Sequence, residues 1–241
     1  MGKPMRQSDR ESLTKHVTSD QKPVGKTWLR LLEMACVFLA FPALIASFAS
    51  WPILPLLWLV AGGCGYLLLR DPNFDRRNLW RSKALSGNMK TILLEGVAAG
   101  LLLTGFVALF FPELLFSLVK QKPLLWLAIL LFYPLLSVYP QEVIYRAFFF
   151  HRYRRFFPKK WALVATNALL FGYMHIVFHN GTAVALTLVG GLIFALSYER
   201  RHSLLFVSLQ HALYGGLVFT VGLGRFFSSG TIATVAGSLP F

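Results

Sequence analysis

The sequence predicts an all-α polytopic membrane bundle with about seven to eight transmembrane helices. Hydrophobic residues make up 56% of the 241 residues and charged residues only 14%, whereas about a quarter of the residues in a soluble globular chain are charged. The apolar residues form long runs, and a helix of about 20 apolar residues crosses the roughly 30 Å core of a bilayer. Basic residues cluster between these runs. A soluble chain of this composition would lack the polar side chains to cover its surface.

Seven apolar runs are long enough to cross a membrane. The expected spans cover about 28–50, 52–69, 91–111, 123–150, 161–178, 183–198 and 203–222. The link Ser50-Trp51-Pro52 predicts a tight hairpin, because proline is well suited to the first turn of a helix. The fourth run is longer than one crossing requires, and Pro134 and Pro140 interrupt it. Residues 223–241 predict either a partial eighth span or an interfacial segment.

The basic residues predict which side of the membrane each loop occupies. With the N-terminus in the cytosol and seven crossings, the strongly basic segments all fall inside: 1–27, 70–90, 152–160 and 199–201. The less basic loops fall outside: 51, 112–122 and 179–182. This alternation follows the rule that cytosolic loops carry an excess of Lys and Arg. We therefore expect a multi-pass integral membrane protein with a cytosolic N-terminal tail, in a bacterial inner membrane.

The net charge of +14 is also typical of nucleic-acid-binding proteins. Here the 24 basic residues do not interleave with aromatic residues in a soluble domain. Membrane topology accounts for them, so no nucleic-acid partner is expected. The two cysteines, Cys36 and Cys64, lie in apolar runs without a pairing or metal-binding pattern, and we expect them to pack as small apolar side chains.

Ionisable residues inside apolar spans cost roughly a few kcal/mol or more each and therefore indicate function. Glu33 and Glu95 lie near the cytosolic starts of their spans, where they can reach the interface or pair with Arg30 or Lys90. Glu142 has apolar residues on both sides. It precedes Arg146 by four residues, a spacing that favours an ion pair on one helix face. Such a pair is either purely structural or part of a functional site.

Two of the six histidines, His175 and His211, also lie inside spans. The other four lie in or next to polar segments or at the end of a span, where solvation explains them. A buried Glu and His can together polarise a water, with the carboxylate as base and the imidazole orienting the water or stabilising charge. The set of Glu142, Arg146, His175 and His211 therefore predicts a catalytic site within the membrane.

Three short patterns on separate spans resemble the motifs of one family. In chain order they are Gln141-Glu142-x-x-x-Arg146, Phe171-x-x-x-His175 and His211-x-x-x-Gly215. They are similar to the E-E-x-x-x-R, F-x-x-x-H and H-x-x-x-N motifs of the CPBP family, the CAAX-prenyl-endopeptidase and bacteriocin-processing (Abi-type) intramembrane proteins. Order and spacing both agree with the family, and the resemblance covers roughly 123–222.

The resemblance implies a glutamic-type intramembrane endopeptidase that cuts a membrane-associated peptide or protein tail with an activated water. Carried over motif by motif, Glu142 and His175 act on the water, His211 stabilises the oxyanion and Arg146 orients the carboxylate. The other motif positions are expected to bind substrate: Gln141, Phe171 and Gly215. The implied organisation is a tail at 1–27, N-terminal transmembrane helices at 28–122, a catalytic core at 123–222 and an apolar tail at 223–241.

Two positions depart from the family pattern. Gln141 stands where the family's prenyl endopeptidases have the Glu that acts as base, and an amide cannot take a proton from water. Glu142 would have to replace it, yet consecutive helix positions point roughly 100° apart. Gly215 replaces the Asn of the third motif, and losing one oxyanion donor typically costs roughly a few kcal/mol. These departures predict a rearranged site, a weak activity or a non-catalytic descendant.

Straight helices would separate Glu142 from His175. At a rise of about 1.5 Å per residue, the two lie roughly 15 Å apart in depth, with Glu142 nearer the cytosol. A working site therefore requires bent or broken helices, and Pro134 and Pro140 are expected to provide the break. A helix starting at Pro140 would hold Glu142 in its first turn, where an anion is favoured.

Three other functions are compatible with parts of this pattern. An immunity, chaperone or scaffold protein is favoured by Gln141 and Gly215. A proton-coupled carrier is consistent with buried ionisable residues, but the sequence lacks repeated halves. A metal site from Glu142, His175 and His211 is chemically possible, although no H-E-x-x-H pattern supports it. We expect no cofactor, with a divalent metal left open, and we expect a peptide or membrane-protein substrate and membrane lipid as partners.

Overall fold

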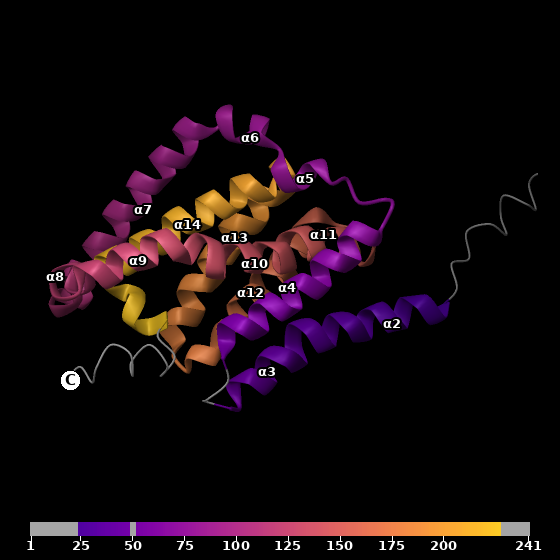
Figure 1. Cartoon of the computed structure of the whole chain (residues 1–241), viewed down its shortest axis with the longest axis horizontal. Helices are drawn as coiled ribbons and strands as arrows, with labels where there is room; N and C mark the ends of the chain where they lie inside the picture. Colours follow the sequence, from indigo (N-terminus) through magenta and orange to yellow (C-terminus); the bar gives the residue numbers. More distant parts are fainter. Residues whose placement is uncertain (1–23, 49–51, 228–241) are drawn as a thin grey trace, which may run out of the picture.

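The computed structural model describes residues 24–48 and 52–227, which fold into helices without any strand (Figure 1). Seven helices in this part of the chain are long and apolar enough to span a membrane: Thr27–Ala46, Ile53–Arg70, Met89–Phe110, Pro123–Phe156, Lys160–Phe178, Gly181–Arg201 and Leu204–Val221. The predicted all-α polytopic bundle is therefore confirmed. The hairpin turn at residue 51, most of the tail at 1–27 and most of the tail at 223–241 lie outside the described residues.

The first three spans come from the N-terminal half. Their elements are α2 (Val24–Ala35), the π-helical η1 (Cys36–Ala40), α3 (Phe41–Ala46), α4 (Ile53–Arg70) and α7 (Met89–Phe110). Two short helices, α5 (Arg77–Trp80) and α6 (Ser82–Ser86), lie between α4 and α7. After α7, the 3-10 turn η2 (Pro112–Leu114) and α8 (Ser117–Gln121) lead into the fourth span.

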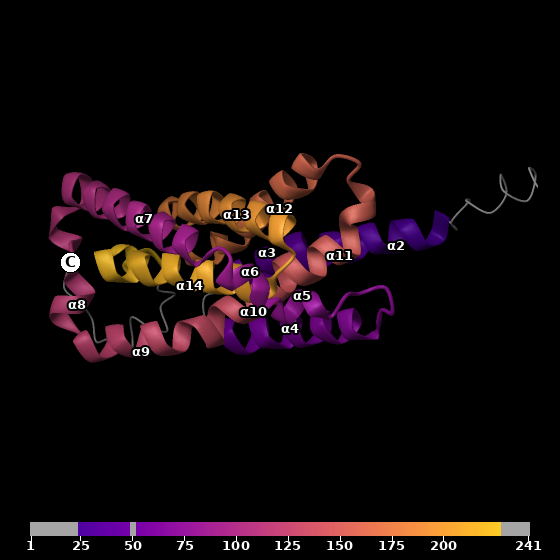
Figure 2. The same cartoon turned by 90° about the horizontal axis from the view of Figure 1, so that it is seen from above.

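The fourth span bends as it crosses the molecule, and two π-helical segments interrupt its regular helix (Figure 2). Its elements are α9 (Pro123–Tyr133), η3 (Pro134–Val138), α10 (Tyr139–Glu142), η4 (Val143–Phe148), α11 (Phe149–Tyr153) and the 3-10 turn η5 (Arg154–Phe156). Proline lacks a backbone N–H and clashes with the preceding turn, and a π segment accommodates such a disruption. The residues flanking each π segment keep right-handed helical dihedral angles. The chain therefore bends without the break that was expected at Pro134 and Pro140.

The last three spans complete the bundle. Their elements are α12 (Lys160–Met174), the 3-10 turn η6 (His175–Phe178), α13 (Gly181–Arg201), α14 (Leu204–Val221) and the 3-10 turn η7 (Leu223–Phe227). Helix α14 packs between α7 and α9 (Figure 2). It ends at Gly222, whose φ of +107° suits glycine. A Cβ there would overlap the carbonyl oxygen of Leu114, so the close approach of the two segments also requires glycine.

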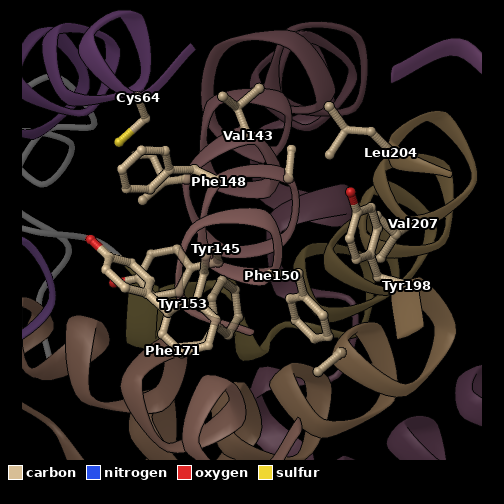
Figure 3. Packing of buried hydrophobic residues seen from close by; sticks show 14 of the residues in the cluster. Cys64, Val143, Tyr145, Phe148, Phe150, Tyr153, Phe171, Tyr198, Leu204 and Val207 are labelled. Atoms are coloured by element: carbon tan, nitrogen blue, oxygen red, sulfur yellow. The ribbon is translucent and has the colours of Figure 1, made fainter. Parts of the chain in front are cut away.

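The core forms around the middle of the fourth span. Every residue from 140 to 150 is buried, although most membrane helices keep one face toward lipid. Side chains from this segment pack outward in several directions, with Phe148 toward Cys64 and Phe150 against the Tyr198 ring at 5.2 Å between centres (Figure 3). Because the first motif lies within this segment, its polar side chains are surrounded by protein.

The basic segments meet at one end of the bundle. Glu33 of α2 accepts hydrogen bonds from the Arg152 guanidinium at 2.6 and 2.9 Å, and Asp71 lies 2.9 Å from the His151 imidazole. Glu199 at the end of α13 pairs with Arg154 at 2.6 Å. At the opposite end, the backbone N–H of Phe116 donates to Val221. The loops that the charge pattern assigns to the cytosol are thus joined to one another.

Candidate active site

The first motif lies at the junction of α10 and η4, which is a π-helical turn. A π turn leaves backbone groups without their usual α-helical partners. Within this turn, the carbonyl of Tyr145 accepts a hydrogen bond from the buried side chain of Asn167 on α12 at 2.6 Å. This contact fixes the motif helix against α12, which carries the second motif.

Glu142 is fully buried and has two ionisable neighbours. Its Oε1 lies 2.8 Å from Nδ1 of His211 on α14. Its Oε2 lies 3.3 Å from Nε of Arg146, one helical turn away, and both of these side chains are 0% exposed. A carboxylate without such partners would be costly at this depth. The pairing predicted from the spacing of Glu142 and Arg146 is present, and His211 extends it to a third helix.

Two aromatic rings and a carbonyl surround the guanidinium of Arg146. Its Cζ lies 4.3 Å from the centre of the Phe171 ring and 5.6 Å from that of Phe194. Its Nη2 donates to the carbonyl of Gly191 at 3.4 Å, while Nη1 has no hydrogen-bond partner among the described residues. Cation–π contacts of this kind are stronger in a desolvated setting. These contacts hold the Arg146 guanidinium beside the Glu142 carboxylate.

His211 connects Glu142 to the hydroxyl of Tyr133. A carboxylate only accepts hydrogen bonds, so Nδ1 of His211 carries the proton and donates to Glu142. The second ring nitrogen, Nε2, lies 3.2 Å from Oη of Tyr133 on α9. The imidazole stacks on Phe194 with 4.5 Å between ring centres and an interplanar angle of 22°. These contacts fix both the orientation and the tautomer of the ring.

His175 begins the η6 turn, where α12 ends. Its Nδ1 lies 2.7 Å from the carbonyl oxygen of Phe171, so Nδ1 donates there. In the neutral ring Nε2 is then an acceptor, and no described residue bonds to it. The ring also packs edge-on against Phe171 at 4.9 Å, and Phe171 packs against His211 at 5.6 Å. Phe171 of the second motif therefore lies between the two imidazoles.

A cavity of about 770 Å³ lies within the bundle, and apolar side chains form most of its wall. Among the polar groups in the wall are Tyr133, Gln141, His175 and His211, whereas Glu142 is absent from it. Gln141 donates from Nε2 to the hydroxyl of Ser137 at 2.8 Å. Its Oε1 is buried without a hydrogen-bond partner in the part of the chain that the structure describes. The two consecutive motif residues thus point to different places, Gln141 to the cavity and Glu142 to His211.

The structure brings the sequence-predicted residues together in two groups. Glu142, Arg146 and His211 form one ion-paired cluster, while Gln141, His175 and Gly215 line the cavity with Phe171. His211 belongs to both. Sequence reasoning missed Tyr133 and Phe194, because an aromatic residue in an apolar span has no signal of its own. The replacement of Asn by Gly215 is the sequence signal that could have pointed to a compensating side chain.

The other two acidic residues in spans have partners away from the cavity. Glu33 pairs with Arg152 and also accepts a hydrogen bond from the Tyr153 hydroxyl at 2.7 Å. Glu95 accepts from Nε2 of Gln210 at 2.8 Å. The suggested pairing with Arg30 or Lys90 is not the one observed. Within the described residues, no group of three His, Cys, Asp or Glu side chains is arranged to hold a metal ion.

Comparison with known proteins adds one finding. Residues 122–217 match a family described as type II CAAX prenyl endopeptidase Rce1-like. No curated protein and no solved structure matches the chain. The matched segment begins just before α9 and ends within α14, so it contains all three motifs together with Tyr133, Gly191 and Phe194. Over residues 122–217 the chain is therefore similar to the type II CAAX prenyl endopeptidases, which supports the resemblance to the CPBP family.

Proposed function

We propose that this protein is an intramembrane endopeptidase that cleaves a membrane-associated peptide or protein tail in the central cavity. The observation that carries the proposal is the pair of oriented imidazoles, His175 and His211, in the wall of one apolar cavity. Each donates from Nδ1 to a fixed acceptor, so each presents Nε2 elsewhere. Two such groups are what amide hydrolysis needs, one to take a proton and one to stabilise charge.

In this mechanism His175 is the general base. Its Nε2 has a free lone pair, and the Phe171 carbonyl holds the ring from the other side. A water in the cavity, whose wall includes both His175 and Gln141, donates one hydrogen bond to Nε2 of His175. As the water oxygen bonds to the substrate carbonyl carbon, the proton passes to His175. His175 then returns it to the leaving nitrogen as the C–N bond breaks.

Glu142 acts through His211. Its carboxylate is fully buried and lies against the imidazole, so it stabilises a proton on that ring. The same logic explains the carboxylate of a Ser-His-Asp triad, which orients the imidazole and stabilises its charged form. A charged His211 can donate from Nε2 toward the carbonyl oxygen as that oxygen becomes negative. Arg146 pairs with the other oxygen of the Glu142 carboxylate at 3.3 Å and holds it in place.

The cavity supports a substrate that carries a long apolar group. Its volume of about 770 Å³ is toward the upper end of the usual range for small-molecule pockets. Several wall residues are also exposed on the outer surface of the bundle, which lipid would cover: Leu102, Phe132, Leu136 and Val189. A substrate anchored in the bilayer can therefore enter sideways between helices. A lipidated peptide or an apolar transmembrane tail fits this path.

The contacts between basic segments support a cytosolic N-terminus. Segments from α2, the α4–α5 link, α11 and the end of α13 meet at one end of the bundle through ion pairs. The positive-inside rule assigns that end to the cytosol. We infer a multi-pass protein of a bacterial inner membrane with this orientation.

A second candidate is a non-catalytic binder of lipidated peptides. Gln141 favours it, because the first-motif position that faces the cavity carries an amide, and no carboxylate from the described residues lines the wall. Such a protein would bind the same substrates and leave them intact. Binding and cleavage must therefore be measured separately.

The test uses the full chain in lipid nanodiscs with a farnesylated peptide as probe, and mass spectrometry detects cleavage. His175→Gln is the informative variant, because an amide still donates to the Phe171 carbonyl but cannot take the water's proton. His202→Asn is the control, because Asn tolerates the left-handed conformation of this residue, which has φ of +46°. We expect cleavage by the wild type and the control and a loss of at least about 100-fold in His175→Gln.

Two results would contradict the proposal. Equal cleavage by wild type and His175→Gln would remove His175 from the mechanism. Tight binding of the peptide without cleavage by the wild type would favour the non-catalytic binder. Comparing the membrane proteomes of cells with wild type and His175→Gln extends the same test to native substrates, through the C-terminal or propeptide trimming that only the wild type performs.

A further inference from the structure

Tyr133 occupies the space that a side chain at position 215 would need. A Cβ added to Gly215 would overlap both Oη and Cε1 of Tyr133. Real Cβ atoms do not approach other atoms this closely, so glycine is the residue that the ring permits here. The two residues come from facing helices, Tyr133 from α9 and Gly215 from α14. The aromatic ring thus fills the place of the Asn side chain in the third motif that this chain resembles.

The hydroxyl of Tyr133 is aimed at the reactive part of the cavity. Its Oη lies 3.2 Å from Nε2 of His211, and the residue lines the cavity together with His211 and Gly215. Edge-on contacts with His211 and Phe219, at 6.1 and 5.4 Å between ring centres, hold the ring from two sides. Tyr133 is the last residue of α9, directly before the π segment that starts at Pro134.

We propose that the Tyr133 hydroxyl is the second oxyanion donor of this site and takes over the role of the missing Asn. The inference rests on the proposed peptidase function. When His211 carries two protons, its Nε2 no longer accepts a hydrogen bond from the Tyr133 hydroxyl, so Nε2–H and the hydroxyl hydrogen can both point to the carbonyl oxygen. A negatively charged carbonyl oxygen beside Oη accepts that hydrogen. Glu142 thus acts on the substrate through His211, and Tyr133 donates a second hydrogen bond beside it.

Packing alone is the competing explanation for this contact. A tyrosine beside a glycine fills space, and its hydroxyl needs some partner in an apolar wall. Packing depends on the ring and catalysis on the hydroxyl. Tyr133→Phe separates the two, because it keeps the ring and removes one oxygen.

The first measurement is hydrolysis of the farnesylated peptide by Tyr133→Phe in nanodiscs. Loss of one oxyanion donor typically lowers kcat by about 10²–10³-fold, and we expect KM to change by less than about threefold because ground-state contacts persist. Tyr139→Phe is the matched control, since Tyr139 lies outside the cavity wall and stacks on Trp80. An unchanged kcat in Tyr133→Phe would overturn the inference.

An exchange of the two side chains gives a second test. Gly215→Asn alone should lose activity, because its Cβ meets the Tyr133 ring. Tyr133→Ala alone should lose it as well, because the donor is gone. The double variant Tyr133→Ala/Gly215→Asn restores both the space and a donor, so we expect it to exceed each single variant in kcat by at least about tenfold. A double variant no better than the singles would count against the exchange of roles.

A binding measurement separates this inference from the peptidase proposal. A farnesylated peptide aldehyde forms a tetrahedral adduct with water, whereas the matching alcohol does not. We expect the wild type to bind the aldehyde at least about tenfold more tightly, and this ratio should fall toward one in Tyr133→Phe but not in Tyr139→Phe. If the wild type does not hydrolyse the peptide but its aldehyde-to-alcohol binding ratio depends on Tyr133, the peptidase function is refuted. The role of the Tyr133 hydroxyl as a hydrogen-bond donor is then retained. If the wild type hydrolyses the peptide and Tyr133→Phe leaves the binding ratio unchanged, only the proposed role of the Tyr133 hydroxyl is refuted.

Discussion

Arg146 carries a full charge in the most buried part of a membrane protein. Its side chain is 0% exposed, and its only acidic neighbour among the described residues is Glu142. Removing one partner of a buried ion pair costs about 3–5 kcal/mol, because the other charge is left uncompensated. The same two residues belong to the first motif. Stability and function are therefore coupled at this position.

Arg146→Ala should lower the free energy of unfolding by about 3–5 kcal/mol, measured by denaturant unfolding in detergent micelles. Arg146→Lys should recover part of this loss, because it restores the charge but not the planar contact with Phe171. Arg155→Ala is the control, since Arg155 is exposed and stacks on the neighbouring Phe156. Equal stability of Arg146→Ala and Arg155→Ala would show that Glu142 does not depend on this cation.

Gln141→Glu should raise the hydrolysis rate. The substitution puts a carboxylate on a residue that lines the cavity, and a positioned general base contributes about 10²–10⁴-fold. Part of this gain overlaps with the role of His175, so we expect an increase of about tenfold in kcat for the farnesylated peptide. Gln121→Glu is the control, because Gln121 in α8 is exposed and lies outside the cavity wall. A hydrolysis rate that stays the same or falls would mean that the attacking water does not lie next to the side chain at position 141.

The motif residues could be predicted from the sequence, but their partners could not. Ionisable side chains in apolar runs and the spacing of Glu142 to Arg146 identify candidates directly. The 2.8 Å contact between Glu142 and His211 joins residues 69 positions apart, so it depends on how α10 packs on α14. Tyr133 lies in an otherwise apolar run and had no distinguishing pattern.

At the scale of elements, straight helices would place Glu142 and His175 roughly 15 Å apart in depth. The π segments explain why the motifs that carry them still meet. The fourth span is 34 residues long and bends through η3 and η4, while α12 ends in a 3-10 turn at His175. Proline at 134 and 140 predicts an irregularity at this place but not its form. A π turn and a full break leave the same sequence signal, and packing against α12 and α14 decides between them.

Gly96 on α7 lets this helix approach α14 closely. A Cβ at Gly96 would lie 2.6 Å from Cδ2 of Leu213, while one at Gly105 on the same helix would meet nothing within 4 Å. Gly96→Val should therefore lower the free energy of unfolding by about 1–3 kcal/mol through overpacking, and Gly105→Val by less than about 0.5 kcal/mol. Thermal unfolding in detergent measures both. Equal losses would contradict the close approach of Gly96 to Leu213 as the source of the effect.

At the scale of the whole molecule, ion pairs connect the basic segments to one another at one end of the bundle. The hydrogen bond from His151 lowers the pKa of Asp71, which lies just beyond α4. The charge pattern in the sequence predicted that these segments share one side of the membrane, although it named no partners. The apolar bulk of the chain, its seven spans and their order were all readable from hydropathy and charge. The cavity could not be predicted from hydropathy and charge, because side chains from seven separate spans form its wall.

Cysteine labelling tests the orientation of the bundle. In a Cys36→Ser/Cys64→Ala background, a cysteine at Asn73 should react with a membrane-impermeant maleimide only when the cytosolic face is open. A cysteine at Gln121, in α8 at the opposite end, should react in intact cells. The reverse pattern would place the N-terminus outside and contradict the positive-inside assignment.

Glu142 acts through His211 in the proposed mechanism, and a double-mutant cycle measures this coupling most directly. The quantity is kcat/KM for the farnesylated peptide in the wild type, Glu142→Gln, His211→Gln and the double variant. If Glu142 works only by orienting and charging His211, the double variant should be no slower than His211→Gln alone, because the two residues act as a unit. A double variant whose loss equals the product of the two single losses would show that Glu142 acts on the water independently and would contradict this mechanism.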